Sequence, residues 1–163
     1  MTVRVGINGF GRIGRNFFRA VAASGADIEI VGVNDLTDNK VLAHLLKFDT
    51  ILGRFPDEVS ARDGHLYVAG RQVKMLSAEK PGDVNWGDLG VETVIEATAK
   101  FRTRAELERH LEMGAKRVIL CTPPADPPDS LLARAAIRRC SIRRMDFARS
   151  SAHHRWECVC RHS

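Results

Sequence analysis

The sequence predicts an α/β fold, in which a doubly wound parallel sheet carries a small antiparallel insertion. Three features of its 163 residues support that prediction. A glycine-rich turn joins an alternating strand to an amphipathic helix within residues 2–24. Apolar strands and helical segments then alternate as far as residue 121. Between residues 57 and 76, turn signals at Asp63-Gly64 and Ala69-Gly70 interrupt that alternation and indicate antiparallel hairpins.

The first strand and the first helix are joined by the sequence G-x-G-x-x-G. Residues 2–8 alternate as a strand does, and residues 15–24 repeat apolar side chains at helical spacing. Gly9 permits a tight turn, Gly11 lets the backbone approach a pyrophosphate, and Gly14 lets the helix pack closely on the strand. The amide groups at a helix N-terminus attract phosphates. Together these features predict a Rossmann-type dinucleotide-binding site.

An acidic residue follows the second expected strand, residues 27–34. Asp35 lies 21 residues after Gly14, close to the offset of about 20 residues expected for an acid that binds the adenosine ribose. A carboxylate at this position would repel the 2′-phosphate of NADP. The sequence therefore predicts NAD as the dinucleotide.

The remaining elements continue the α/β alternation. A helix is expected from the cap Asp38 to about residue 48, and another from the capping box Thr103–x–x–Glu106 to residue 113. His44, His65 and His110 fall in the expected helices or turns and are interpreted as surface or boundary residues. Strands are expected at residues 58–62, 66–68, 72–76, 92–98 and 116–121. In parallel sheets the ligand lies beyond the carboxyl ends of the strands. The residue pairs expected at those ends are Asn8-Gly9, Asn34-Asp35, Thr98-Ala99 and Cys121-Thr122.

Six further features of the sequence are distinctive when taken together: N-G-F-G-R-I-G-R (8–15), V-N-D-L (33–36), K-F-D-T-I-L-G-R-F (47–55), Trp86, E-A-T-A-K-F (96–101) and G-A-K-R-V-I-L (114–120). Together they resemble the glyceraldehyde-3-phosphate dehydrogenase family, in register over residues 1 to about 129. The resemblance implies NAD as cofactor and a cofactor-binding set of Asn8, Gly9, Gly11, Arg12, Ile13, Gly14, Asn34, Asp35, Lys80, Thr98, Phe101 and Cys121.

Within that set the resemblance implies particular roles. Arg12 and Ile13 would contact the pyrophosphate, and Asp35 the adenosine ribose. The other implied positions are beside the adenine (Lys80), near the nicotinamide ribose (Cys121) and along the cofactor groove (Thr98, Phe101). Two residues depart from the family pattern. Ala99 replaces a glycine, which would crowd a close backbone approach. Cys121 replaces a hydroxyl residue with a weaker hydrogen-bonding group.

The resemblance ends after about residue 129. The family's enzymes oxidise an aldehyde through a nucleophilic cysteine, with hydride transfer to NAD, and form homotetramers. Neither Cys140 nor Cys158 nor Cys160 stands in the family's cysteine motif, so no catalytic residue is assigned. We expect residues 1–129 to be an incomplete NAD-binding domain without the catalytic domain, inactive alone. Whether the chain is an enzyme stays undecided.

Residues 130–163 have a different composition, with eight arginines, three of the four cysteines, no lysine and no glycine. That break favours a segment unrelated to the family, such as an out-of-frame sequence. One alternative is a non-enzymatic, basic arm that binds nucleic acid or anionic surfaces. The other is a metal site built from His153, His154, Cys158, Cys160 and His162, although C-x-C spacing suits zinc poorly. No apolar run reaches the roughly 20 residues that span a bilayer, and we expect a cytoplasmic protein.

Overall fold

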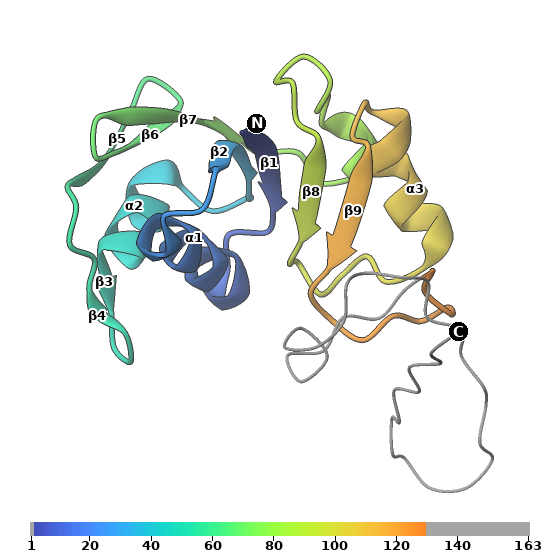
Figure 1. Ribbon diagram of the computed structural model, residues 1–163, viewed down its shortest axis with the longest axis horizontal. Helices are drawn as coiled ribbons and strands as arrows, with labels where there is room; N and C mark the ends of the chain where they lie inside the picture. Colours follow the sequence, from blue (N-terminus) through green and yellow to red (C-terminus); the bar gives the residue numbers. More distant parts are fainter. Residues whose placement is uncertain (1, 130–163) are drawn as a thin grey trace, which may run out of the picture. The chain divides into compact units, whose positions relative to one another are not determined.

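A seven-stranded sheet forms the centre of the fold (Figure 1). The structure is a computed structural model that describes residues 2–129. Its strand order is β5-β6-β7-β2-β1-β8-β9. The strands are β1 (Val3–Asn8), β2 (Ile28–Asn34), β5 (Val59–Arg62), β6 (His65–Val68), β7 (Arg71–Leu76), β8 (Thr93–Glu96) and β9 (Arg117–Leu120). Five of them, from β7 to β9, run parallel to their neighbours, whereas β5, β6 and β7 pair antiparallel.

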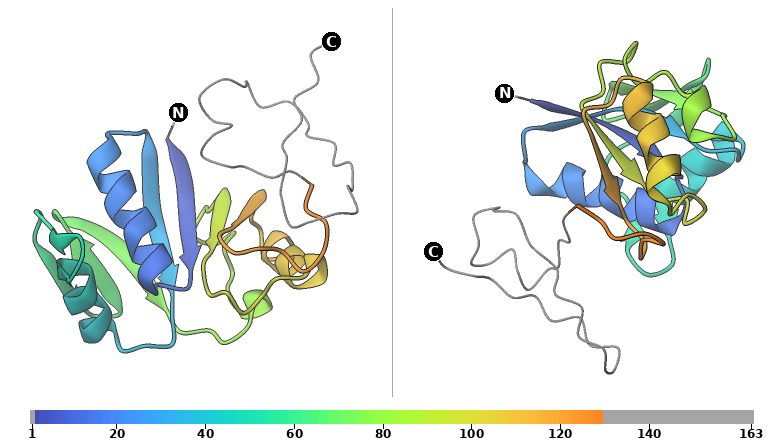
Figure 2. Two further views of the ribbon diagram at one scale, coloured as in Figure 1. Left: turned by 90° about the horizontal axis from the view of Figure 1, so that it is seen from below. Right: turned by 90° about the vertical axis from the view of Figure 1, so that its right-hand side faces the viewer.

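Helices cover both faces of the sheet (Figure 2). Helices α1 (Arg12–Ser24) and α2 (Asn39–Lys47) lie on one face, and α3 (Arg104–Glu112) lies on the other. Each face has its own apolar cluster, because neighbouring residues of a strand point to opposite sides. Ile7, Phe18 and Leu46 belong to the first cluster, and Trp86 and Val94 belong to the second. The predicted doubly wound α/β fold is confirmed.

Two of the helices begin at side-chain caps that the sequence predicts. The Asp38 carboxylate accepts hydrogen bonds from the backbone N–H groups of residues 40 and 41, at 2.9 and 3.3 Å, and starts α2. Thr103 and Glu106 form a reciprocal capping box at the start of α3. Such caps satisfy amide groups that have no partner within the helix. Helix α1 differs, since no side chain caps it.

The structure departs from the sequence-based expectations at several elements. Helix α1 begins at Arg12, inside the glycine motif, and not at residue 15. The third strand of the predicted insertion, β7, pairs in parallel with β2 and so also belongs to the central sheet. A short hairpin, β3 (Phe48–Asp49) and β4 (Gly53–Arg54), and a 3-10 helix at Pro81–Asp83 were not predicted.

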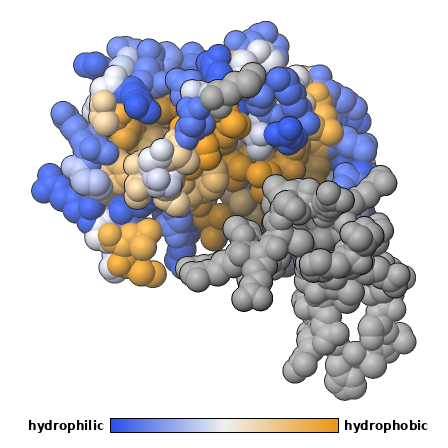
Figure 3. Space-filling model, viewed as in Figure 1, coloured by the Kyte–Doolittle hydropathy of each residue, from blue (hydrophilic) through white to orange (hydrophobic). Residues whose placement is uncertain are grey.

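The β3–β4 hairpin carries exposed apolar side chains at its turn. Ile51 is 81% exposed and Leu52 is 51% exposed. Figure 3 shows the corresponding hydrophobic surface on the side of the molecule where the hairpin projects from the sheet. The Asp49 carboxylate shapes the turn by accepting hydrogen bonds from the backbone N–H groups of both residues, at 2.9 and 2.8 Å. These bonds lower the pKa of Asp49, the one from Leu52 most strongly.

The expected boundary at residue 129 and the three interpretations of residues 130–163 fall on or beyond the end of the described residues. Contacts divide the chain between Ala125 and Asp126. Between residues 2 and 129, no helix has the length and apolar character needed to cross a membrane. Within the same range, no three His, Cys, Asp or Glu side chains are grouped so that they could hold a metal ion. The predicted metal alternative lies outside the described residues.

Candidate functional site

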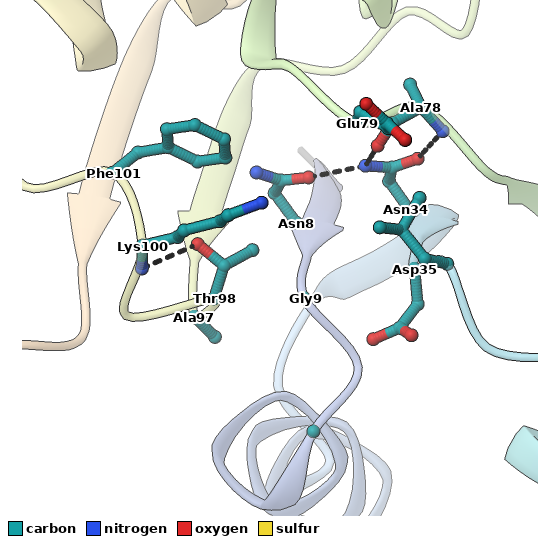
Figure 4. A pocket seen from close by; sticks show the side chains of 12 residues that line it. Asn8, Gly9, Asn34, Asp35, Ala78, Glu79, Ala97, Thr98, Lys100 and Phe101 are labelled. Carbon is teal, nitrogen blue, oxygen red and sulfur yellow. Dashed lines mark hydrogen bonds between the residues drawn. The ribbon is translucent and has the colours of Figure 1, made fainter.

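A pocket of about 230 Å³ lies beyond the carboxyl ends of the central strands (Figure 4). It is bordered by the segments that follow β1, β2, β7 and β8. This is the edge of a parallel sheet at which ligands bind. The residues that line the pocket are Asn8, Gly9, Gly11, Asn34, Asp35, Leu36, Ala78, Glu79, Ala97, Thr98, Lys100 and Phe101.

The glycine turn between β1 and α1 is closely packed at two of its three glycines. Gly9 has φ +92°, and a Cβ atom there would lie 2.7 Å from the backbone nitrogen of Thr98. A Cβ atom on Gly14 would lie 2.2 Å from the carbonyl oxygen of Gly9. Both distances are below any ordinary contact, so neither position accommodates a side chain. Gly11 differs, because an added Cβ would have no atom within 4 Å and would project into open space.

The N-terminus of α1 opens from this turn without a side-chain partner. Gly11 is the N-cap residue, no side chain accepts a hydrogen bond from the first amide groups, and the first turn carries no acidic residue. In contrast, α2 and α3 are both capped. The first N–H groups of a helix carry a partial positive charge that favours an anion. The arrangement suits a phosphate group above Gly11.

Asp35 lies at the end of β2 and faces the same turn. Its Oδ2 accepts a hydrogen bond from the backbone N–H of Phe10 at 2.7 Å, and its Oδ1 accepts one from Thr37 N–H at 2.9 Å. A carboxylate has about four acceptor positions, so each oxygen retains one. Asp35 therefore fixes the glycine turn and still offers two acceptor positions, the number that two ribose hydroxyl groups require.

Two buried asparagines form the floor between these segments. Asn8 is 1% exposed and Asn34 is 4% exposed. The Asn34 side-chain amide donates to Asn8 Oδ1 at 2.7 Å. It also donates to the Ala78 carbonyl at 2.9 Å, while Asn34 Oδ1 accepts from Ala78 N–H at 2.7 Å. The segments after β1, β2 and β7 are thus joined by side-chain hydrogen bonds.

The structure brings seven of the twelve predicted cofactor-binding residues together at the pocket: Asn8, Gly9, Gly11, Asn34, Asp35, Thr98 and Phe101. The other five do not line it. Arg12, Ile13 and Gly14 occupy the first turn of α1 beside the pocket. Lys80 is exposed and directly follows the pocket residue Glu79. Cys121 is half-buried and packs against the first apolar cluster.

Ala99, for which the family resemblance implies a glycine, adopts a left-handed conformation with φ +60°. An alanine in that region is strained by contact between its Cβ atom and the backbone, by about 1–2 kcal/mol. Alanine in place of glycine at position 99 therefore strains the backbone of the loop between Thr98 and Lys100. The Thr98 hydroxyl accepts a hydrogen bond from Lys100 N–H at 3.1 Å and helps to hold the loop in that conformation.

Several residues of the site were not predicted. Leu36, Ala78, Glu79, Ala97 and Lys100 line the pocket, and each is adjacent in sequence or space to a predicted residue. Figure 4 shows the Lys100 side chain extending toward Asn8, which places a positive charge at the pocket. Glu96 was also missed as a site residue, although an acid inside an apolar strand is a signal, since acids are rarely buried without partners.

His110 was predicted to be a surface or boundary residue, and that prediction was wrong. Its side chain is fully buried. Trp86 Nε1–H donates to His110 Nδ1 at 2.9 Å, and His110 Nε2 lies 3.0 Å from Glu96 Oε2. Trp86 and Glu96 are distant from His110 in sequence, so the helical spacing around His110 gave no sign of these hydrogen bonds.

These features define a class of protein. A parallel sheet, an uncapped helix behind a glycine turn, and an acid at the next strand end constitute a dinucleotide-binding domain of the Rossmann type. NAD fits the donor set: amide groups and open space face its phosphates, and the Asp35 carboxylate faces a ribose. The class that the fold and the site define is therefore a dinucleotide-binding domain whose donor set suits NAD.

Comparison with known proteins identifies the family. Residues 3–104 match the family model described as glyceraldehyde 3-phosphate dehydrogenase, NAD binding domain. The chain belongs to this family, whose domain binds NAD. It is 56% identical over 126 residues to glyceraldehyde-3-phosphate dehydrogenase of Streptomyces coelicolor, covering 77% of this chain and 38% of that protein. It is 53% identical over 133 residues to the enzyme of the same name from Mycolicibacterium smegmatis, covering 77% and 39%.

The chain spans less than two fifths of the length of these relatives. The similarity covers the segment that contains the glycine turn, Asp35 and the pocket-lining loops. It thus supports the NAD-binding part of the family prediction.

Proposed function

We propose that residues 2–129 bind NAD through its adenosine diphosphate half. The phosphates lie above Gly11 at the N-terminus of α1, contacting Arg12 and Ile13, and the adenosine ribose lies against Asp35. The observation that carries this proposal is the pairing of an uncapped helix with an acid that is hydrogen-bonded to the same turn. Anion attraction at the helix and hydroxyl recognition at the acid match the two polar parts of the ligand.

The remaining predicted residues have places consistent with the same ligand orientation. Lys80 follows Glu79 at one side of the pocket, where the adenine would lie beyond Asp35. Thr98 and Phe101 border the opposite side, toward which the nicotinamide half would extend. Cys121 follows β9, the neighbour of β8, and would lie near the nicotinamide ribose.

We further propose that the domain serves the activity of its family, the oxidation of an aldehyde with phosphate incorporation by a cytoplasmic homotetramer. When bound, NAD supplies the hydride acceptor. The share of residues 2–129 is to bind and orient that cofactor. We assign no nucleophilic role to Cys121. Burial and, to a smaller degree, the charge of Glu96 raise the pKa of the Cys121 thiol, which keeps it protonated at neutral pH.

The test is a calorimetric titration of the full chain with NAD, ADP-ribose and NADP. We expect NAD and ADP-ribose to bind with similar affinity, because the contacts named above involve mainly the shared half. NADP should bind at least about tenfold more weakly, since its 2′-phosphate meets the Asp35 carboxylate.

The variant Asp35→Asn should bring the NAD and NADP affinities closer together. Asp63→Asn is the matched control: it removes one negative charge from the β5–β6 turn, where Asn also tolerates the left-handed φ of +52°. It should leave the ratio unchanged. Equal binding of NAD and NADP by the parent chain, or no binding of either, would refute the proposal.

A further inference from the structure

A fully buried carboxylate, Glu96, lies at the last position of β8 beneath the pocket. Four hydrogen bonds converge on it. Its Oε2 accepts from Asn8 Nδ2 at 2.5 Å and pairs with His110 Nε2 at 3.0 Å. Its Oε1 accepts from Thr98 N–H at 2.9 Å and from the Thr98 hydroxyl. A buried carboxylate is strongly unfavourable unless it is hydrogen-bonded, and here all of its roughly four acceptor positions are used.

The side of Glu96 away from the pocket is anchored by an imidazole with a defined tautomer. The Trp86 indole only donates, so His110 Nδ1, which accepts its N–H at 2.9 Å, carries no proton. The proton of the neutral ring is therefore on Nε2, which donates to Glu96. Trp86 and His110 are fully buried and fix the carboxylate to α3 and to the segment before β8.

On the side toward the pocket, Glu96 begins a chain of hydrogen bonds between side-chain amides, each of which donates toward Glu96. Asn8 uses its N–H₂ group for Glu96, so its Oδ1 faces Asn34 and accepts from it. Asn34 in turn binds both the carbonyl and the N–H of Ala78. Every amide in the chain thus has one orientation only. The segments after β1, β2, β7 and β8 are all connected to one carboxylate, and Figure 4 shows the asparagine part of this chain.

We propose that Glu96 is the positioning residue of the pocket: it holds the four surrounding segments in the arrangement that receives the dinucleotide. The inference deepens the proposed NAD-binding function and rests on it. Glu96 itself is buried and contacts no ligand. It acts through Asn8 and Thr98, which line the pocket. Four donors require an acceptor without protons, and among side chains only a carboxylate offers that number.

The decisive substitution is Glu96→Gln, which preserves shape but replaces one oxygen by an N–H₂ group. At the Oε2 position that group would face the Asn8 and His110 donors, and at the Oε1 position it would face the Thr98 N–H, so at least one hydrogen bond is lost in either orientation. Val68→Ala is the control. Val68 is buried in β6, far from Glu96 in the strand order, and its truncation also destabilises the fold. The two variants are compared under conditions where both are folded.

Two measurements on the full chain test the role. The first is amide hydrogen exchange without ligand. Glu96→Gln should accelerate exchange about tenfold or more at Thr98 and also at Ala78, which touches Glu96 only through the two asparagines. The second is titration with ADP-ribose, for which the dissociation constant should rise about tenfold or more. Val68→Ala should leave both quantities within about twofold of the parent when corrected for global stability.

Unchanged exchange at Ala78 in Glu96→Gln, or equal acceleration in Val68→Ala, would overturn the positioning role. So would an ADP-ribose affinity that Glu96→Gln leaves unaltered while the parent binds. Failure of the parent to bind ADP-ribose would instead refute the proposed function, and the exchange at Ala78 would still decide whether Glu96 connects the segments.

Discussion

Replacing Ala99 by glycine should stabilise the protein, contrary to the usual effect of glycine substitutions. Ala99 has φ +60°, in the left-handed region. Removing its Cβ atom relieves about 1–2 kcal/mol of steric strain. Glycine also increases the conformational entropy of the unfolded chain, which lowers the free energy of unfolding by about 0.4–1 kcal/mol. The expected net gain in the free energy of unfolding is about 0.5–1 kcal/mol, or roughly 1–4 °C in melting temperature.

Urea denaturation followed by circular dichroism measures this change. The matched control is Ala20→Gly, at an exposed position in the interior of α1, which should lower the free energy of unfolding by about 1 kcal/mol. The same chemical change should therefore have opposite signs at the two positions. If Ala99→Gly proves neutral or destabilising, the left-handed conformation of that loop, and the strain attributed to it, are incorrect.

Three further predictions concern separate features. Gly14→Ala should lower the free energy of unfolding by about 1–3 kcal/mol, because its Cβ atom would lie 2.2 Å from a carbonyl oxygen. Gly11→Ala should lower it by only about 0.5–1 kcal/mol but should weaken the binding of ADP-ribose. Urea denaturation measures the first effect and calorimetric titration the second. The pKa of Glu106 is lowered by hydrogen bonds from the backbone N–H and hydroxyl of Thr103 and from the N–H of the residue before it. The contribution of Glu106 to stability is therefore present above the ordinary glutamate pKa and is lost as the pH falls through the lowered pKa. The difference in urea midpoint between the parent and Glu106→Gln should accordingly vanish in acid, and a difference that persists there would contradict the assignment. Cys121 should react with iodoacetamide at pH 8 more slowly than a free cysteine does, as followed by peptide mass spectrometry, because its pKa is raised; equal rates would count against its burial.

The sequence was sufficient to predict the features that depend on local chemistry. The cap at Asp38, the capping box at Thr103 and Glu106, and the turns at residues 63–64 and 69–70 are all present. Each is determined by residues within four positions of one another, so short-range patterns suffice. The start of α1 was misplaced because glycine disfavours helices, whereas here Gly14 lies inside the helix to permit its close approach to the turn.

Long-range contacts explain what the sequence did not reveal. Glu96 and His110 are 14 residues apart, and His110 and Trp86 are 24 residues apart, yet they form one buried hydrogen-bonded group. Nothing in the helical pattern around His110 distinguishes it from a surface histidine. The β3–β4 hairpin has only two residues in each strand, too few for an alternating pattern to appear.

The most direct test of the central claim is to map where ADP-ribose binds the full, isotopically labelled chain by two-dimensional NMR. The account predicts saturable shifts in the backbone amide signals of Gly11, Arg12 and Ile13, where the phosphates meet the uncapped helix, and of Asp35 and Leu36 at the ribose. Signals from the β3–β4 hairpin should not move. Saturating ligand that leaves the Gly11–Ile13 amides unshifted, or shifts only residues away from this turn, would contradict it.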